Sequence, residues 1–338
     1  MIDLQVAVNL TAAVVEGVMN TGLDASKLHG SEIFSTVPMD TETVNVKIEL
    51  PTNFLEDESG NAAPGVANTE TVFSDVNLRA TWKKTGKTFD YNDFTNYVIE
   101  KKIRTFVETA GELPSLFDER MATRLLVRGT LASNPIAYDN LPFFNSAHPA
   151  VPGFATTFSN NVDCGLITTG APAAQTVTSV RSAIIKGIQN VRSVPLADGA
   201  MLDVFEPFQI WCHTLMEGIV SDAWESAFIS GAGSGAQDVS AFRGKYSVKP
   251  IASPYLDKQI AEAKAAGLIS GNVESVMYLV CKPRGDAAGL IMGTQSPFTL
   301  VNDLPAITDG AKISSFSMQL RGRNAHNYGL PHFIHRLF

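Results

Sequence analysis

The sequence predicts an α+β fold, in which strands and amphipathic helices occupy successive stretches of the chain. Apolar and polar residues alternate with period two over residues 43–50 and again over 76–82, which indicates two strands. Apolar residues recur at three- and four-residue spacing over residues 91–109, which indicates a helix. Residues 173–252 then alternate between helical and strand-like patterns, and this predicts a compact α/β unit.

Composition narrows the class of protein. The chain has 338 residues, of which 45% are hydrophobic and 18% charged, against a usual charged fraction of about 25%. So low a charge fraction is typical of a subunit that buries much of its surface against neighbours. The net charge of −8 argues against a generic nucleic-acid binder, which would carry a basic face. No apolar run approaches the ~20 residues of a membrane span, and the first residues lack the basic region of a secretory signal.

The first strands form an arm in this interpretation. A short amphipathic helix is expected over residues 3–20, and a hairpin follows over residues 41–84. Its two strands are joined by residues 51–71, which are rich in Pro, Gly, Asn and acidic residues. Because a lone hairpin is only marginally stable in water, we expect this arm to project and to contact a surface elsewhere, such as another chain.

Two helices are expected after the arm. The first covers residues 91–109 and is stopped by Gly111. The second begins at Pro114, with Ser115 as its N-cap, and ends at Gly129. Residues 133–172 are rich in turn residues and aromatics, which predicts ordered irregular chain.

The remaining chain supplies the α/β unit and two final strands. The expected elements are a helix over 176–192, a strand within 201–213, a helix over 214–228, a Gly/Ser loop, a strand over 244–252, a helix over 256–267, a strand over 276–282, and strands over Ile313–Gly322 and His326–Leu337.

No catalytic or cofactor motif emerges. Thr85–Thr88 resembles the end of a Walker A loop, but Thr81 stands where that motif needs glycine. The glycines of residues 231–236 follow a helix instead of a strand, so a flexible loop is the better interpretation. The six histidines and three cysteines lack metal-ligand or nucleophile spacing, and the cysteines are expected to be buried thiols. We therefore expect no enzyme, no metal and no cofactor.

Charge is distributed unevenly along the chain. Residues 1–78 carry a net charge of −10, from 2 basic and 12 acidic residues. Residues 79–128 carry +3 and residues 312–338 carry +4, whereas residues 129–311 carry −5. Two interpretations stay open. Either the charge merely varies from one solvent-exposed surface to another, or the acidic front part lies on a basic part of a neighbouring copy.

Several segments, in order, resemble one known family. Residues 138–149 (YDNLPFFNSAHP) are similar to a YDG..FF...HP segment in the major head subunits of Mu-like phages, with Asn140 where the family usually has glycine. Asn is tolerable there because it also accepts a positive φ. Further similar segments are Lys87–Phe94, Phe208–Glu217, Gly244–Leu256 and Ser317–Leu330.

This resemblance implies the Hong Kong 97-type phage capsid fold. It implies an N-terminal arm over residues 1–40, an extended hairpin called the E-loop over 41–84, a peripheral domain with a long spine helix over 85–172, an axial domain over 173–300, and C-terminal strands over 301–338 that return to the peripheral domain.

The implied function is that of a major capsid protein. Such a chain self-assembles into hexamers and pentamers of an icosahedral shell around double-stranded DNA, in the virion, after assembly in the cytoplasm of the bacterial host. The implied partners are portal, scaffold and decoration proteins, with scaffold supplied by a separate chain, and no membrane. An encapsulin-like compartment shell and a soluble hydrolase are the alternatives.

One contact between subunits follows from the charges. Arginines spaced four residues apart advance about 400° and form a single stripe on a helix. The candidates are three adjacent acidic residues at the arm's tip and three such arginines: Glu56, Asp57, Glu58, Arg120, Arg124 and Arg128. Further basic candidates are Lys101, Lys102, Arg104, Arg321, Arg323 and Arg336. The alternative is a stripe that solubilises the helix and pairs with Asp118, Glu119 or water.

Overall fold

A computed structural model describes most of the chain. The described residues are 28–49, 73–90, 98–132, 137–150, 155–195, 208–225, 228–230, 237–239, 247–283, 287–303 and 315–338. The helix expected over residues 3–20, the acidic tip of the arm with Glu56, Asp57 and Glu58, and the glycine loop at 231–236 lie outside these residues.

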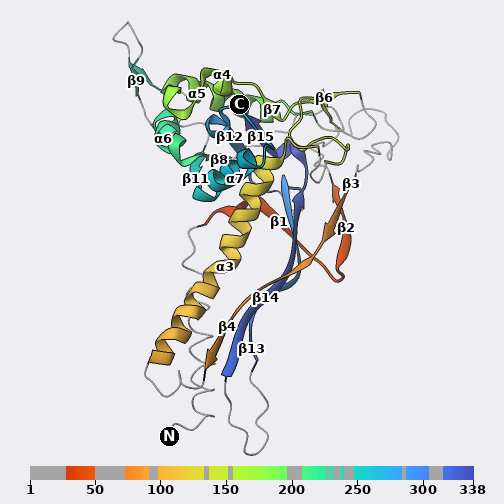
Figure 1. Ribbon diagram of the computed structural model, residues 1–338. Helices are drawn as coiled ribbons and strands as arrows, with labels where there is room; N and C mark the ends of the chain where they lie inside the picture. The colour runs from red at the N-terminus through yellow and green to blue at the C-terminus, as the bar shows by residue number, and fades with distance from the viewer. Residues whose placement is uncertain are drawn as a thin grey trace, which may run out of the picture.

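A long four-stranded sheet runs beside the longest helix (Figure 1). Its strand order is β1-β13-β14-β4, with β1 parallel to β13 and the other pairs antiparallel. The bounds are Phe34–Pro38 for β1, Leu290–Asp303 for β13, Ser315–Tyr328 for β14 and Thr81–Asp90 for β4.

A second, five-stranded sheet forms the centre of the upper part of the molecule in Figure 1. Its order is β11-β8-β12-β15-β7, with bounds Val248–Ala252, Phe208–Cys212, Met277–Cys281, Ile334–Leu337 and Asn161–Val162.

Helices cover both faces of this five-stranded sheet. Met277 and Leu279 of β12 join one apolar cluster with helices α5 (Val177–Arg192) and α6 (Glu217–Glu225). Tyr278 and Val280, which point to the opposite face, join a second cluster with α7 (Pro254–Ala265) and the end of α3 (Val98–Arg128). Since both faces are buried, β12 is apolar along its whole length.

The predicted helices and strands of the α/β unit are confirmed, but the residues on either side of the predicted Gly/Ser loop form two short paired strands that were not predicted. Thr176 caps α5 by accepting a hydrogen bond from the Ser179 backbone, at the start expected from the sequence. The helix expected over 214–228 is a short 3₁₀ turn followed by α6. The other elements are β5 (His148–Pro149), β6 (Thr157–Phe158), α4 (Leu166–Thr169), β9 (Phe228–Ser230) and β10 (Gln237–Val239), with 3₁₀ turns at Gly30–Ile33, Pro172–Ala174, Thr214–Met216, Val273–Ser275 and Pro331–Phe333.

The prediction of two helices before residue 129 is wrong, because α3 is one helix of 31 residues that contains both Gly111 and Pro114. Val107 and Ala110 on one side of the proline and Ala122 on the other are fully buried. Packing along this continuous face outweighs the hydrogen bond that Pro114 cannot donate. Ser115 is therefore not an N-cap, whereas the predicted end at Gly129 is confirmed.

The two predicted strands do pair as a hairpin, but residues 81–84, which were predicted to belong to it, form the start of β4 in the four-stranded sheet. Strands β2 (Thr43–Glu49) and β3 (Phe73–Arg79) pair in antiparallel register, with Val46 opposite Val76. Val46, Val76 and Leu78 are buried in the large apolar cluster, so the base of the arm packs on its own subunit. After Ala80 the chain passes from β3 into β4.

The C-terminal strands differ from the prediction. Residues 315–328 form one strand, β14, and the last strand β15 is short, because Pro331–Phe333 form a 3₁₀ turn between them. The sequence also did not indicate β13. This strand contains Pro297 and two register shifts against β14, between Thr294 and Thr299, which break the period-two pattern.

Candidate assembly surface

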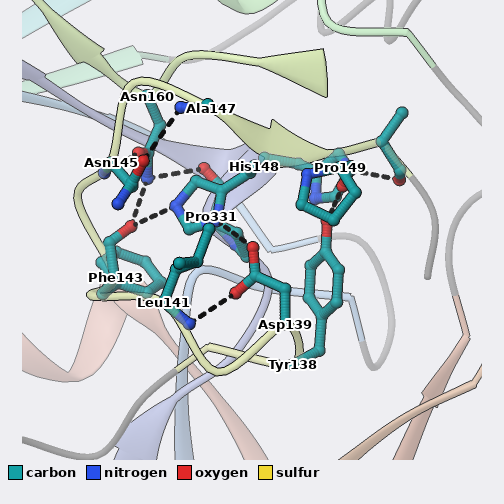
Figure 2. Close-up of polar contacts among 12 residues, drawn as sticks. Tyr138, Asp139, Leu141, Phe143, Asn145, Ala147, His148, Pro149, Asn160 and Pro331 are labelled. Carbon is teal, nitrogen blue, oxygen red and sulfur yellow. Dashed lines mark hydrogen bonds and ion pairs between the residues drawn. The ribbon is translucent and has the colours of Figure 1, made fainter. Parts of the chain in front are cut away.

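A buried clasp is formed by the segment that carries the family resemblance, residues 138–149 (Figure 2). The His148 Nδ1 lies 2.6 Å from the Asp139 carboxylate, and Asp139 also accepts a hydrogen bond from the Leu141 backbone. Asn140 between them has φ of 62°, the positive value expected for it, and it is the one non-glycine residue with positive φ among those described. The Tyr138 hydroxyl donates to the Pro149 carbonyl and closes the turn.

The clasp holds the Asp139 carboxylate and the His148 ring away from water. The side chain of His148 is 0% exposed and that of Asp139 is 6% exposed. The second ring nitrogen of His148, Nε2, lies 3.0 Å from the Phe143 carbonyl. Both ring nitrogens thus face an oxygen acceptor. Burial acts to raise the pKa of Asp139, but the hydrogen bond and charge of His148 outweigh it and hold that pKa below its usual value.

Asn160 ties the clasp to the C-terminal segment, as Figure 2 shows. Its Oδ1 accepts from the Asn145 backbone, while its Nδ2 lies 2.7 Å from the Phe143 carbonyl and 3.3 Å from those of Pro331 and Ile334.

Aromatic stacking joins the clasp to α3 and β14. The Phe143 ring stacks on Tyr328, with centroids 4.4 Å apart, and the Tyr328 hydroxyl donates to the Leu125 carbonyl of α3 at 2.7 Å. Gly129, just after α3, lies against Phe144; a Cβ there would be 2.5 Å from the ring. The clasp therefore connects the end of the long helix to both sheets.

The predicted arginine stripe lies on α3. Arg120 and Arg124 are exposed, and Arg128, one turn further on, is half-buried. The expected alternative, pairing with Asp118 or Glu119, is not found among the ion pairs of the described residues.

Asp118 and Glu119 of α3 are buried, whereas the sequence suggested them only as possible partners of the arginine stripe. Asp118 lies 3.0 Å from the His326 Nε2 of β14. Glu119 accepts hydrogen bonds from the Ser253 hydroxyl at 2.6 Å and the His29 backbone at 3.1 Å. Asp118 stands four residues before Ala122 and seven before Leu125, which would have placed it on the buried face if α3 had been recognised as one helix.

A second basic area covers one face of β4 and β14. Trp82 is 56% exposed, and the guanidinium groups of Arg321 and Arg323 lie 5.9 and 5.5 Å from its ring. Lys84 is exposed and stands directly opposite Arg321 in the strand register. Like charges directly opposite each other in a sheet repel, so this area favours an anionic partner.

Two of the predicted basic residues have partners in their own chain. Arg323 makes an ion pair of 2.8 Å with Glu42, and its hydrogen bond and charge hold the pKa of that carboxyl below its usual value. Arg336 donates to Asn161 at 2.9 Å and lies over the Phe338 ring. The exposed cations left for a neighbour, among those with described side chains, are mainly Arg120, Arg124, Lys84 and Arg321.

An apolar groove lies between α3 and the four-stranded sheet. Its volume is about 270 Å³. Its lining consists of Leu113, Leu116, Phe117 and Arg120 of α3, Lys83, Lys84 and Thr85 of β4, and Tyr255, Phe298 and Leu320.

The other motifs carry no site. Thr85–Thr88 lies in the extended strand β4, so it forms no phosphate loop. Cys212 and Cys281 are buried, Cys164 is half-buried, and burial raises the pKa of Cys164 to about 11 and that of Cys212 to about 12. Within the described part of the chain, no cluster of His, Cys, Asp and Glu suits a metal ion and no helix could cross a membrane.

Comparison with solved structures identifies the fold. The capsid structure of the cyanophage P-SCSP1u matches with a TM-score of 0.52 and 9% sequence identity, over 91% of this chain and 86% of that chain. The mature capsid of bacteriophage PhiM1 matches with a TM-score of 0.49 and 13% identity, over 92% and 87%. The virus-like particle from Pyrococcus furiosus gives a TM-score of 0.42 and 10% identity, over 96% and 98%. No protein-family model and no curated protein matches the chain.

The predicted fold class is therefore confirmed: the chain has the Hong Kong 97-type capsid fold. The resemblance to Mu-like head subunits within this fold, and the boundaries of the five predicted regions, stay predictions.

Proposed function

We propose that this chain is the major capsid protein of a tailed bacteriophage. The observation that carries the proposal is the capsid fold, which extends over nearly the whole chain. A charge fraction of 18% fits a subunit that is covered by neighbours on several sides. Copies of the chain assemble into hexamers and pentamers of a closed icosahedral shell, as a structural protein without enzymatic activity.

The proposal also covers the location of the shell, its partner proteins and its contact with DNA. The shell belongs to the virion, is assembled in the cytoplasm of the bacterial host, and works with a portal, a separate scaffold and decoration proteins. It encloses double-stranded DNA with weak, non-specific contacts, since each neutralised phosphate would make binding tighter and more dependent on salt. The chain's net charge of −8 supports weak contact.

Sedimentation velocity of the expressed chain, with negative-stain microscopy of the same sample, tests the proposal. We expect capsomer rings or closed shells. A small oligomer of fixed size at every protein concentration, without rings or shells, would contradict it.

An encapsulin-like compartment shell is the second candidate. Its supporting observation is the same fold class, because shells of that kind share the architecture that the resemblance implies. The segment at residues 138–149, with its Asp139–His148 clasp, favours the phage protein, since the phage resemblance rests on this segment.

We further infer that the arm's acidic tip contacts basic residues of an adjacent subunit. The supporting observation is that Arg120 and Arg124 are exposed and have no ion pair among the described residues. One exposed pair contributes only about 0–1 kcal/mol, but repetition in every copy can fix the register of assembly.

Changing Glu56, Asp57 and Glu58 together to lysine tests this contact. We expect slow or misdirected assembly of a subunit that is still folded by circular dichroism. Normal shells from the triple variant at both low and high salt would refute the electrostatic contact.

A further inference from the structure

The groove between α3 and the four-stranded sheet has a mainly apolar lining. Leu113, Leu116 and Phe117 stand three and four residues apart, so they share one face of α3, and all three are only half-buried. Phe117 meets Phe298 of β13, with ring centroids 6.4 Å apart. Tyr255 and Leu320 complete the apolar lining. This face of α3 therefore offers apolar surface that a further segment can cover.

The start of the chain has an apolar face of matching kind. In a helix over residues 3–20, five apolar residues fall within about 80° of one another: Leu4, Val8, Ala12, Val15 and Met19. Four polar residues gather on a separate strip of the same helix: Gln5, Asn9, Glu16 and Asn20. An isolated helix of this length is only marginally stable in water, so it needs a surface that covers its apolar face.

The chain enters the described structure beside the groove. The His29 backbone donates to the Glu119 carboxylate at 3.1 Å, and a Cβ at Gly30 would lie 2.4 Å from the Glu119 Cα. Glu119 stands only two residues after Phe117 on α3. The eight residues 21–28 can extend about 28 Å, and a helix of 18 residues is about 27 Å long. A helix over residues 3–20 can therefore reach the groove of its own subunit.

Charge favours the same pairing. Residues 1–26 contain Asp3, Glu16 and Asp24 but no lysine or arginine. Lys83 lines the groove, with its ammonium group 5.5 Å from the centre of the Phe117 ring, and it takes part in no ion pair between described residues. Because Glu16 borders the apolar face of the helix, it can meet Lys83 while that face is packed.

A second hollow near His29 suits the segment less well. Its volume is about 360 Å³, but Ile33, Val280 and Cys281 are the only apolar side chains in its lining. The rest of the lining is Glu32, Gln209, Lys249 and Lys282, and Glu32 already pairs with Lys249 at 3.7 Å. An apolar helix face gains more by covering the groove beside α3.

We propose that residues 3–20 form a helix that docks in the groove between α3 and the four-stranded sheet of its own subunit. The face of Val8 and Val15 packs on Leu116 and Phe117, and Glu16 pairs with Lys83. This contact goes beyond the proposed shell function and does not depend on it, because it lies within one subunit.

Thiol labelling of the full chain tests the docking without any shell. Leu116→Cys places a thiol in the groove, and its rate of reaction with a maleimide is measured by mass spectrometry of the peptide that contains it. The chain is held below its assembly concentration, and circular dichroism checks that each variant is folded. We expect labelling to become about ten-fold faster when the chain also carries Val8→Asp with Val15→Asp, since the groove is then uncovered.

The matched control adds the same charges on the polar strip. Asn9→Asp with Asn20→Asp should change the labelling rate by less than about two-fold. Leu113→Cys, one turn earlier on α3, repeats the measurement at a second position and should give the same contrast.

Cross-linking identifies which copy supplies the helix. A chain with Val15→Cys and Leu116→Cys should form an internal disulfide on oxidation, whereas Asn9→Cys with Leu116→Cys should not. A mixture of chains that carry Val15→Cys or Leu116→Cys singly should give no linked dimer.

Each outcome decides the proposal. Equal labelling in the three backgrounds, at both groove positions, would overturn the docking. Linked dimers from the mixture, without an internal disulfide in the double variant, would overturn docking on the same subunit. If labelling and cross-linking are as expected but the chain forms no shells, the docking stands and the shell function is refuted.

Discussion

Asp139 and His148 hold one another in the buried clasp, with 2.6 Å between the His148 Nδ1 and the Asp139 carboxylate. Replacing Asp139 with alanine would leave the imidazole of His148 buried without a carboxylate. Removal of one member of a buried pair typically costs about 3–5 kcal/mol. We expect Asp139→Ala to lower the free energy of unfolding of the unassembled subunit by this amount, measured in urea.

The control for this variant lies in the same turn. Asn140→Gly suits a φ of 62° and should change the free energy of unfolding by less than about 1 kcal/mol. An Asp139→Ala chain as stable as the Asn140→Gly chain would show that the clasp does not support the fold.

Two other histidines give stability a dependence on pH. Burial lowers the pKa of His332 to about 3 and that of His335 to about 4, from an ordinary 6.5. Between about pH 4 and 6.5 the unfolded chain binds these protons and the folded chain does not. The free energy of unfolding therefore falls as pH falls through this window, by about 1.4 kcal/mol per pH unit for each histidine, and neither contributes a slope above pH 7.

His332→Gln isolates this effect. Glutamine can still donate to the Ala150 carbonyl, which accepts from His332 Nε2, but it cannot titrate. We expect the slope of unfolding free energy against pH to decrease by about 1.4 kcal/mol per pH unit between pH 4.5 and 6, measured by urea unfolding. An unchanged slope would contradict the assignment of a neutral, buried His332.

At the scale of elements, the close contact after α3 depends on a missing side chain. A Cβ at Gly129 would lie 2.5 Å from the Phe144 ring, which itself packs against Phe143 and Tyr278. We expect Gly129→Ala to destabilise the subunit by about 1–3 kcal/mol in thermal or urea unfolding, because the ring cannot move away without disturbing the core.

Gly218→Ala in α6 is the matched control. A Cβ at Gly218 meets nothing within 4 Å, so alanine should stabilise the helix by about 0.5–1 kcal/mol. Equal effects of the two substitutions would show that the Phe144 contact is not tight.

Elements with clean local patterns could be predicted from sequence, and those shaped by distant contacts could not. The alternation over 43–50 and the helical periodicity over 176–192 are local signals, and both identified their elements. Strand β13 has its alternation broken at Pro297, and its neighbours β1 and β14 are far away in sequence. Helix α3 continues through Pro114 because its apolar face is packed along its length, and no local sequence pattern reveals that packing.

The same distinction applies to the candidate surface. The four-residue spacing of the arginines placed Arg120 and Arg124 on one exposed face of α3. Sequence could not reveal that Arg323 is paired with Glu42, or that Asp118 faces His326, because these partners meet only through the tertiary fold. The apolar groove, whose walls come from five separate elements, left no signal in any single stretch of sequence.

On the scale of the whole molecule, the chain combines a long helix beside a long sheet with a compact sheet and its helices (Figure 1). Its hairpin base packs on the same subunit, while residues 1–78 carry a net charge of −10. An acidic front part, together with exposed cations on α3 and the sheet, is suited to repeated contact between copies.

Cryo-electron microscopy of the particles formed by the expressed chain tests the central claim most directly. We predict closed icosahedral shells made of hexamers and pentamers, in which α3 and the four-stranded sheet are recognisable in every subunit and the β2–β3 arm contacts a neighbour. Particles without icosahedral order, or a chain that stays a small oligomer under all conditions of salt and concentration, would contradict the account.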